Sequence, residues 1–191
     1  MISTADFKRG MRILVDGGPY VIMDYTVQTP SARGAATLVR TKIRNVLTRA
    51  VFDRTFKAGD RFEEPDIEIR PVQFLYRDGD DFHFMDQASY EQFHLPADAL
   101  GDGPRYLAEG SVVRSLSFNG VIAGIELPQF MEFDVTETEP AVRGDTASGK
   151  VLKEAKVATG AMVKVPLYIE TGERILVATE TGEFVKRVPK S

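Results

Sequence analysis

The sequence predicts an all-β protein made of three small barrels. Short runs in which apolar and polar residues alternate recur along the 191-residue chain, from RILVD near its start to RILVAT near its end, as is typical of half-buried strands. Asp-Gly, Asn-Gly and Thr-Gly-Glu turns separate many of these runs and indicate hairpins. Little helix is expected: the best candidate is LPADALGD, where Pro96 opens a single turn and Gly101 closes it.

The predicted domains are residues 1–64, 65–128 and 129–191. Each third of the chain contains about five strand runs, which is enough for one small barrel and favours three barrels over one large sandwich. One boundary lies near FEEPDIE, where a proline and four carboxylates interrupt the apolar pattern. The other lies near ELPQF, where Pro128 precedes a new strand.

The clearest of the expected strand runs follow one another in each domain. The first domain contains RILVD, YVIMDYTV, ATLVRTKI and AVFDRTF, with a turn at residues 16–18. The second contains VQFLY, DFHFMD, SVVRSLSF and VIAGIEL, with turns at 77–81 and 119–120. The third contains MEFDVTE, AMVKVPLYI and RILVAT, with turns at 171–173 and 181–183. We interpret each of these turns as the tip of a hairpin.

Composition argues against several functional classes. Apolar residues make up 43% and charged residues 27%, as in ordinary globular proteins, and no apolar run approaches the roughly 20 residues that span a bilayer. Because the N-terminus lacks the apolar core of a signal peptide, we expect a cytoplasmic protein. With no cysteine and two histidines, little remains for thiolate, zinc or triad chemistry. We expect no metal, no cofactor and no enzymatic activity.

The net charge of −4 is unevenly distributed. Residues 1–64 contain 11 Lys/Arg and 7 Asp/Glu, residues 65–128 contain 4 and 11, and residues 129–191 contain 9 and 10. A basic first third on an acidic chain indicates one end that faces a polyanion. Chance scatter of charges over solvated faces is the alternative interpretation.

The stretch QTPSARGAATL, residues 28–38, places Arg33 at a predicted hairpin tip between two strand runs. Its neighbours Pro30, Ser31, Ala32 and Gly34 have little bulk and leave space around the guanidinium. Five fixed donors on that group suit a phosphate, a ribose or a base edge. The alternative is an exposed loop arginine that only aids solubility.

The strand after this tip carries Arg40, Lys42 and Arg44 at alternate positions. Because side chains two residues apart share one face of a strand, the three cations are expected to form a stripe that leads away from the tip. Such a stripe suits contact with an RNA backbone.

A polar loop, EPAVRGDTASGK at residues 139–150, lies between strands of the third domain, with Arg143 and Lys150 beside its glycines and hydroxyls. A Walker A motif needs a hydroxyl residue directly after the lysine and then a helix, whereas Val151 follows here. We therefore reject nucleotide hydrolysis.

The acidic run RDGDDFHFMD raises the question of a metal site. Asp78, Asp80 and Asp81 lie at a tight turn, where aspartate is favoured by local hydrogen bonds to the backbone. We interpret His83 and His94 as barrel-wall residues, because neither has a nearby carboxylate or nucleophile arranged for a triad.

Over essentially its whole length, the sequence resembles bacterial elongation factor P. The resemblance rests on ISTADFKRGMRILVDGGPYVI, FLYRDGDDFHFMDQASYEQF, EPAVRGDTASGKVLKEA and VPLYIETGERILVATETGEFVKRV, which follow the family's order and spacing. It implies an N-terminal SH3-like (KOW-like) barrel followed by two OB-fold barrels, in an L-shaped arrangement that imitates tRNA.

The resemblance also implies a function. Family members bind the ribosome between the peptidyl and exit sites and promote peptide bond formation when consecutive prolines stall synthesis. The family's tip residue maps onto Arg33 and reaches the end of the peptidyl-tRNA, whereas Arg143, Gly144, Asp145 and Thr146 match a third-domain loop near the small subunit. The implied partners are the ribosome, peptidyl-tRNA and rRNA, for a monomer that binds no membrane.

The subgroup within the family stays open. The tip looks more like the elongation factor P-like (YeiP-type) paralogues, whereas RGDTASGK and TGEFVKRV resemble the ordinary factor. Arginine at position 33 excludes lysine-specific modification and leaves rhamnosylation by an arginine-modifying glycosyltransferase, or no modification. We expect an unmodified Arg33, because the tip loop looks longer than that of the ordinary factor and this length replaces the reach that a modification supplies.

A general RNA-binding or chaperone protein built from OB folds is the alternative function. Proteins of that kind display aromatic platforms beside basic residues. This chain has no tryptophan, and its middle third is acidic, so the translation factor is the leading hypothesis.

Overall fold

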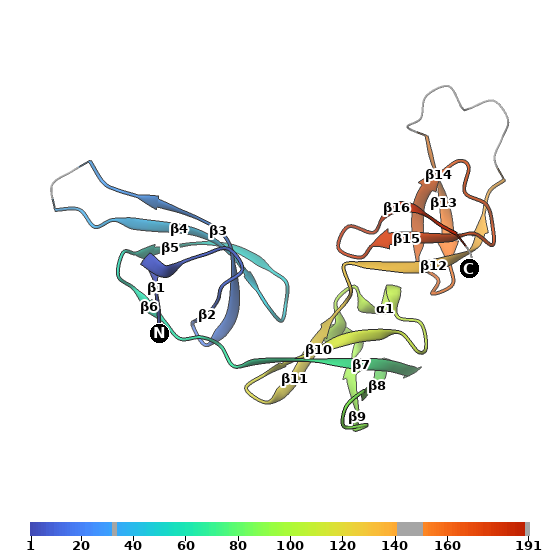
Figure 1. The fold of residues 1–191 in the computed structure, drawn as a ribbon, viewed down its shortest axis with the longest axis horizontal. Coiled ribbons are helices and arrows are strands. Elements are labelled where there is room, and N and C mark those ends of the chain that lie inside the picture. The colour runs from blue at the N-terminus through green and yellow to red at the C-terminus, as the bar shows by residue number, and fades with distance from the viewer. Residues whose placement is uncertain (32–33, 141–150, 190–191) are drawn as a thin grey trace. The chain divides into compact units, whose positions relative to one another are not determined.

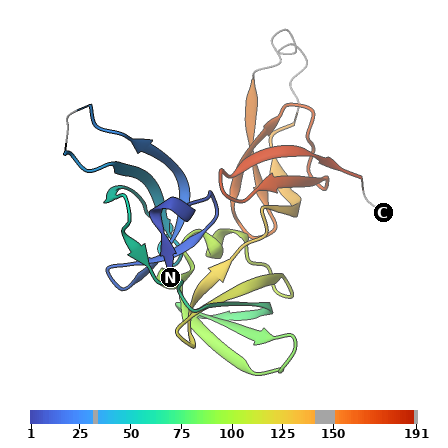
Figure 2. The ribbon, with the colours of Figure 1, turned by 60° about the vertical axis from the view of Figure 1, so that its left-hand side comes forward.

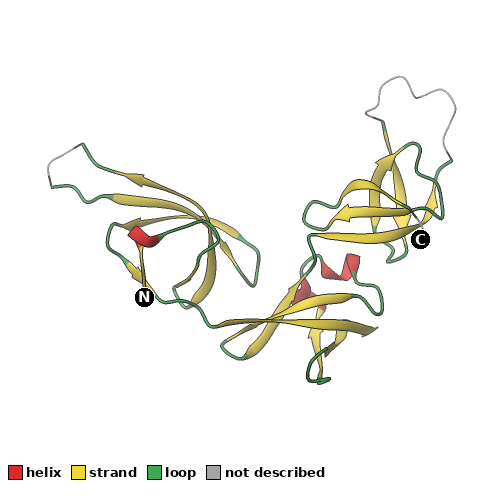
Figure 3. Ribbon diagram, in the orientation of Figure 1, coloured by secondary structure: helices red, strands yellow, loops and turns green. Residues whose placement is uncertain are grey.

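The computed structural model describes residues 1–31, 34–140 and 151–189 (Figure 1). Strands dominate these residues, as Figure 3 shows, and the prediction of an all-β fold is confirmed. Three short helical turns interrupt the strands: η1 (Thr4–Asp6), η2 (Ala97–Leu100) and α1 (Gly103–Tyr106). The turn η2 follows Pro96 and ends before Gly101, as predicted. The sequence pattern did not predict η1 or α1.

The chain divides into two compact units. The first contains Met1–Ile69 and Ser115–Gly124, and the second contains Arg70–Arg114 and the chain from Ile125 onward. The division into domains 1–64, 65–128 and 129–191 stays a prediction.

The first sheet has the strand order β2-β3-β4-β5. Its strands are β2 (Arg12–Val15), β3 (Gly18–Gln28), β4 (Leu38–Asn45) and β5 (Val51–Lys57), and a two-stranded sheet pairs β1 (Ile2–Ser3) with β6 (Arg61–Phe62). Their buried side chains form a core of Phe7, Ile13, Val15, Ile22, Val39 and Ile43. Beyond this core, β3 and β4 continue as a long hairpin (Figures 1 and 2).

The middle sheet has the strand order β11-β10-β7-β8-β9. Its strands are β7 (Ile67–Asp78), β8 (Asp81–Asp86), β9 (Gln92–Pro96), β10 (Val112–Phe118) and β11 (Val121–Glu126). Alternate residues of β8 are buried, so Phe82 and Phe84 face the core while His83 and Met85 lie on the opposite face. The aromatic rings of Phe74, Phe82 and Phe84 pack together inside.

The third sheet has the strand order β14-β13-β12-β15-β16. Its strands are β12 (Phe130–Thr138), β13 (Leu152–Val157), β14 (Met162–Pro166), β15 (Arg174–Ala178) and β16 (Glu183–Val188). Its core contains one residue that comes from α1, Tyr106, which is 2% exposed and lies 5.8 Å from Phe133 between ring centroids. The polypeptide before β10 therefore contributes to the core under the third sheet.

Four predicted hairpins are confirmed. The turns at residues 77–81 and 181–183 join the paired strands β7 and β8 and the paired strands β15 and β16, and the other two are also confirmed by their turn geometry. Asp16 (φ +49°) and Gly17 (φ +78°) join β2 to β3, and Asn119 (φ +50°) and Gly120 (φ +77°) join β10 to β11. Two consecutive left-handed residues give the turn whose twist matches an antiparallel pair, and Gly, Asn and Asp adopt that conformation at the least cost.

One predicted hairpin is wrong. The Thr-Gly-Glu turn at residues 171–173 lies between β14 and β15, but β14 pairs with β13 while β15 pairs with β12 and β16. A turn signal reports only that the chain reverses locally. Which strand becomes the partner is decided by burial across the sheet, which the turn does not encode.

Asp86 stabilises the end of β8 through its carboxylate. One oxygen, Oδ1, accepts hydrogen bonds from the backbone N–H groups of Ala88 (2.7 Å) and Ser89 (2.9 Å), and Oδ2 lies 3.8 Å from Arg70. The hydrogen bonds from Ser89 and Ala88, with the charge of Arg70, hold the pKa of Asp86 below its usual value. A lowered pKa means that the ionised carboxylate of Asp86 interacts more favourably with its surroundings in the folded state than in the unfolded state.

The variant Asp86→Asn is therefore expected to lower the free energy of unfolding at pH 7. The contribution of the charge is complete above the unfolded-state pKa of about 4 and is lost as the pH falls through the lower folded-state pKa. Urea unfolding of both proteins from pH 7 to pH 2.5 should show their stabilities converging in acid. A difference that is constant over this range would show that the charge of Asp86 makes no contribution.

Candidate nucleic-acid interface

The hairpin of β3 and β4 carries the predicted tip. The two strands pair from Tyr20↔Asn45 to Gln28↔Leu38, with an irregularity in register between Ile22 and Asp24. At the connection, Pro30 is half-buried, whereas Ser31 and Gly34 are exposed, and Gly34 has a φ of +88°. The predicted tip residues Ala32 and Arg33 lie outside the described residues.

The predicted cationic stripe lies along β4. Val39, Thr41 and Ile43 are buried, and the alternate residues Arg40 and Lys42 are exposed while Arg44 is half-buried. Since the three alternating residues are buried, the three cations must lie on the opposite face, because successive side chains of a strand point to opposite sides. The three cations thus share a face, and their contact with RNA stays a prediction.

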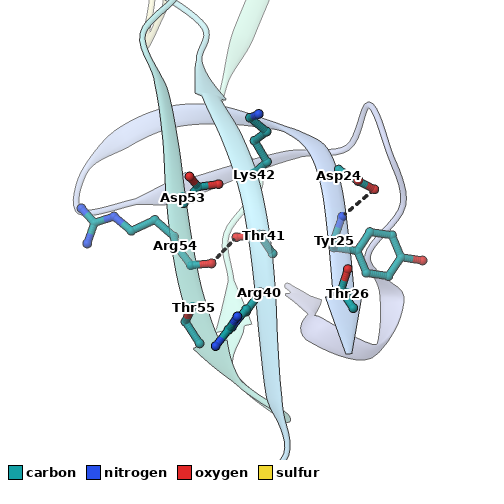
Figure 4. Close-up of a pocket in the computed structure, with 9 residues that line it drawn as sticks. All are labelled: Asp24, Tyr25, Thr26, Arg40, Thr41, Lys42, Asp53, Arg54 and Thr55. Carbon is teal, nitrogen blue, oxygen red and sulfur yellow. Dashed lines mark hydrogen bonds between the residues drawn. The ribbon is translucent and has the colours of Figure 1, made fainter. Parts of the chain in front are cut away.

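The stripe borders a shallow trough of about 540 Å³ that three neighbouring strands form. Figure 4 shows the residues that line it, with β4 in the centre. Thr41 ties two of the strands together, because its hydroxyl donates a 2.9 Å hydrogen bond to the carbonyl oxygen of Arg54. The residues along the trough are Asp24, Tyr25, Thr26, Arg40, Thr41, Lys42, Asp53, Arg54 and Thr55.

Lys42 is surrounded by negative charge. Its cross-strand partners are Asp24 on β3 and Asp53 on β5, and directly opposite side chains in a sheet lie close enough to interact. Asp24 is also bound by Arg9, with 2.7 Å between Nη2 and Oδ1. Hydrogen bonds from Arg9 and the Tyr25 N–H, and to a lesser extent the charge of Lys42, lower the pKa of Asp24. These two carboxylates reduce the positive field of Lys42, although Lys42 forms no ion pair with either of them.

Arg40 has a different environment. Its cross-strand partners are Thr26 and Thr55, and it forms no ion pair with any residue that the structure describes. A guanidinium offers paired donors in one plane, and hydroxyls on either side add further donors, which together suit a phosphate group. The stripe is thus graded by its neighbours, because hydroxyls lie across from Arg40, toward the tip, and carboxylates lie across from Lys42.

Alternation in the sequence predicted the cations of this site. It did not predict the cross-strand neighbours that give Arg40 and Lys42 different environments. Thr26, Thr55, Asp24 and Asp53 lie on two other strands, and their pairing depends on register. A register irregularity beside Met23 shifts the second half of β3 relative to β4, and no local sequence signal marks it. The run FDRTF did place Asp53 and Thr55 on one face of β5.

The other predicted loop falls between β12 and β13. Arg143, Gly144, Asp145 and Thr146 all lie outside the described residues, so their role stays a prediction. Among residues 1–31, 34–140 and 151–189, no group of three or more His, Asp or Glu residues is arranged to hold a metal ion. No helix in the same part of the chain is long and apolar enough to cross a membrane.

Comparisons with known proteins cover the chain almost from end to end. Residues 3–62 match the elongation factor P KOW-like domain, residues 67–125 the elongation factor P OB domain, and residues 131–187 the elongation factor P C-terminal domain. Elongation factor P of Moorella thermoacetica is 44% identical over 187 residues, covering 98% of this chain and 100% of that protein. The protein of that name from Thermodesulfovibrio yellowstonii is 43% identical over 188 residues, covering 98% and 99%.

A solved structure supports the same fold. Eukaryotic translation initiation factor 5A from Methanococcus jannaschii aligns with a TM-score of 0.52 and 22% identity, covering 66% of this chain and 90% of that chain. At this identity the likeness concerns the fold alone, and it agrees with an all-β arrangement of several barrels.

The fold and the full-length matches define a translation elongation factor with KOW-like and OB domains. The chain belongs to the elongation factor P family. A factor of this class works with the ribosome. The resemblance predicted from the sequence is thereby confirmed at the level of the family, whereas the YeiP-type subgroup stays a prediction.

Proposed function

We propose that this factor binds the ribosome between the peptidyl and exit sites and promotes peptide bond formation where consecutive prolines stall synthesis. The observation that carries the proposal is the graded stripe, in which Arg40 lacks a carboxylate partner among the described residues while Lys42 has two as neighbours. Arg40 lies near the end of the hairpin that bears Arg33, so an RNA strand bound there extends toward the tip.

The mechanism is one of positioning. Proline has a fixed φ and a secondary amine, which makes it a slow acceptor and a poorly placed donor. Arg40 holds a phosphate of the peptidyl-tRNA, and Arg33 contacts the end of the same tRNA. Each tenfold acceleration needs about 1.4 kcal/mol of differential stabilisation, which a few charge-assisted hydrogen bonds supply. The covalent chemistry remains that of the ribosome.

Other features complete the proposal. Arg143, Gly144, Asp145 and Thr146 contact the small subunit or its rRNA through the loop after β12. Arg33 acts unmodified, and rhamnosylation by a glycosyltransferase is the alternative. Intact mass of the protein purified from its native host decides between them, because an added deoxyhexose on Arg33 would contradict the unmodified form.

The graded stripe predicts unequal effects of two matched substitutions. In a purified translation reaction programmed with a proline stall, Arg40→Ala is expected to raise the half-saturating factor concentration by about tenfold, because a hydrogen bond to a charged group contributes about 1.5–3 kcal/mol. Lys42→Ala is expected to raise it by less than about threefold, since neighbouring carboxylates already offset that charge. Both side chains are exposed, so neither variant should change the unfolding midpoint.

Equal effects of the two variants would show that only the total positive charge matters. A larger rise in the half-saturating concentration for Lys42→Ala than for Arg40→Ala would contradict the assignment of Arg40 as the phosphate site. Full relief of stalling by both variants at the wild-type concentration would remove the stripe from the function altogether.

A further inference from the structure

The middle sheet brings the two histidines of the chain together on its solvent-facing side. His83 on β8 and His94 on β9 are direct cross-strand partners, and their ring centroids lie 5.6 Å apart with 34° between planes. His83 is half-buried and His94 is exposed. The two strands are neighbours in the sheet, and β9 forms its edge (Figure 1).

The backbone pattern places this pair at the closer of the two spacings found in antiparallel sheets. The N–H of Asp86 donates to the oxygen of Glu91, and the N–H of Ala97 donates to the oxygen of Asp80. Counting inward from these bonded pairs makes His83 and His94 a non-hydrogen-bonded pair, in which the side chains approach most closely. Both imidazoles are therefore held side by side without any need for the strands to move.

The separation fits a single metal ion between the rings. A metal lies about 2.0–2.1 Å from an imidazole nitrogen, and hence about 3.2 Å from each ring centre, so one ion can join rings whose centres lie up to about 6.4 Å apart. The observed 5.6 Å is within this range. The separation of the rings therefore permits one ion to bind both imidazoles.

The surroundings favour a cation and fix one of the rings. Tyr76 on β7 stacks on His83 with 4.5 Å between centroids and 15° between planes, which restricts the orientation of that imidazole. Residues 65–128 carry 11 Asp/Glu against 4 Lys/Arg, so the net charge of this part of the chain favours positive ions. Neither imidazole is engaged in an ion pair or hydrogen bond within the described part of the chain.

We propose that His83 and His94 form a two-imidazole site for a divalent transition metal ion of the zinc, nickel or copper class. Imidazole nitrogen suits these ions, and affinity for such a site rises toward copper. Two ligands come from the protein, and the remaining coordination positions are open to water or to a ligand from a partner. This site is independent of the proposed function and links the edge strand β9 to β8.

The two histidines form no metal-binding motif along the sequence. His83 and His94 are eleven positions apart in the sequence, and no carboxylate accompanies them at a spacing typical of a metal-binding motif. The chain turns back between β8 and β9, and the register of these strands makes His83 and His94 nearest neighbours across the sheet. Pairing across strands is invisible to a motif search along the sequence.

Titration of the full chain with Ni²⁺ tests the proposal. Calorimetry is expected to show one ion bound per chain, and NMR is expected to show selective broadening of signals from His83, His94 and Tyr76. His94→Gln should weaken binding at least about tenfold, because the second ligand no longer binds in an intramolecular step. His83→Gln should have the same effect, and the double variant should lose the remaining binding.

A relocated histidine provides the matched control. Gln87 is exposed in the turn after β8 and lies four residues along from His83. The combination His94→Gln with Gln87→His keeps two histidines but separates them, so it should bind as weakly as His94→Gln alone. Binding that is equally tight in this control, or that survives loss of both histidines, would place the ion elsewhere and overturn the proposal, as would no binding by the wild-type chain.

Discussion

Replacing Arg33 with alanine is expected to abolish relief of proline stalling while leaving the fold intact. The described residues on either side, Ser31 and Gly34, are exposed and belong to no hydrophobic core. The guanidinium is the only charged group in the stretch from Gln28 to Leu38. Two or three charge-assisted hydrogen bonds to RNA, at about 1.5 kcal/mol or more each, correspond to a loss of at least about a hundredfold in rate.

A polyproline reporter in cells that lack elongation factor P measures this effect. The variant should give the signal of cells without the factor, and Arg33→Lys should recover part of the activity, because lysine keeps the charge but loses the planar pair of donors. Arg40→Ala serves as the comparison within the same hairpin and should retain activity at high expression. A folded Arg33→Ala protein that relieves stalling normally would contradict the role assigned to the tip.

Tyr106→Ala is expected to lower the free energy of unfolding by about 3–5 kcal/mol, the usual cost of removing a buried aromatic ring. Tyr106 is 2% exposed and lies among the buried residues under the third sheet, in contact with Phe133. Its neighbour Arg105 accepts a 2.7 Å hydrogen bond at its backbone oxygen from Thr159. Loss of the ring therefore opens a cavity at the point where the α1 segment joins the core of the third sheet.

Hydrogen exchange resolves this effect by strand, which matters because a chain of several barrels need not unfold in one step. Protection should fall along β12, β13 and β15, whereas amides of β3 and β4 should be unaffected. Tyr106→Phe is the matched control and should retain most of the stability, since the ring remains. Loss of protection confined to α1 would mean that Tyr106 adds little to the core under the third sheet.

Alternation along the sequence predicted eleven of the described strands and the cationic stripe, but it missed β1, β6, β9, β13 and β16. Period-two patterns are local, and burial of Val39, Thr41 and Ile43 on one face of β4 leaves Arg40 and Lys42 on the other. The paired turn residues at 16–17 and 119–120 were equally local signals, because the backbone conformation that they favour is set by the residues themselves.

Features that depend on pairing between distant strands could not be predicted. The carboxylates beside Lys42 and the threonines beside Arg40 come from register, and a register irregularity in β3 alters it without a sequence signal. The contribution of Tyr106 to the third core has the same origin, because no pattern within GPRYL shows which sheet its ring will enter.

The central claim is that this chain accelerates peptide bond formation at consecutive prolines by positioning the peptidyl-tRNA. The most direct measurement is the single-turnover rate of bond formation on purified ribosomes that hold a peptidyl-tRNA ending in proline, with prolyl-tRNA as the acceptor. The factor is predicted to increase this rate by at least about tenfold and to leave the rate with phenylalanyl-tRNA and a non-proline donor nearly unchanged. An equal rate with and without the factor at saturating concentration would contradict the claim.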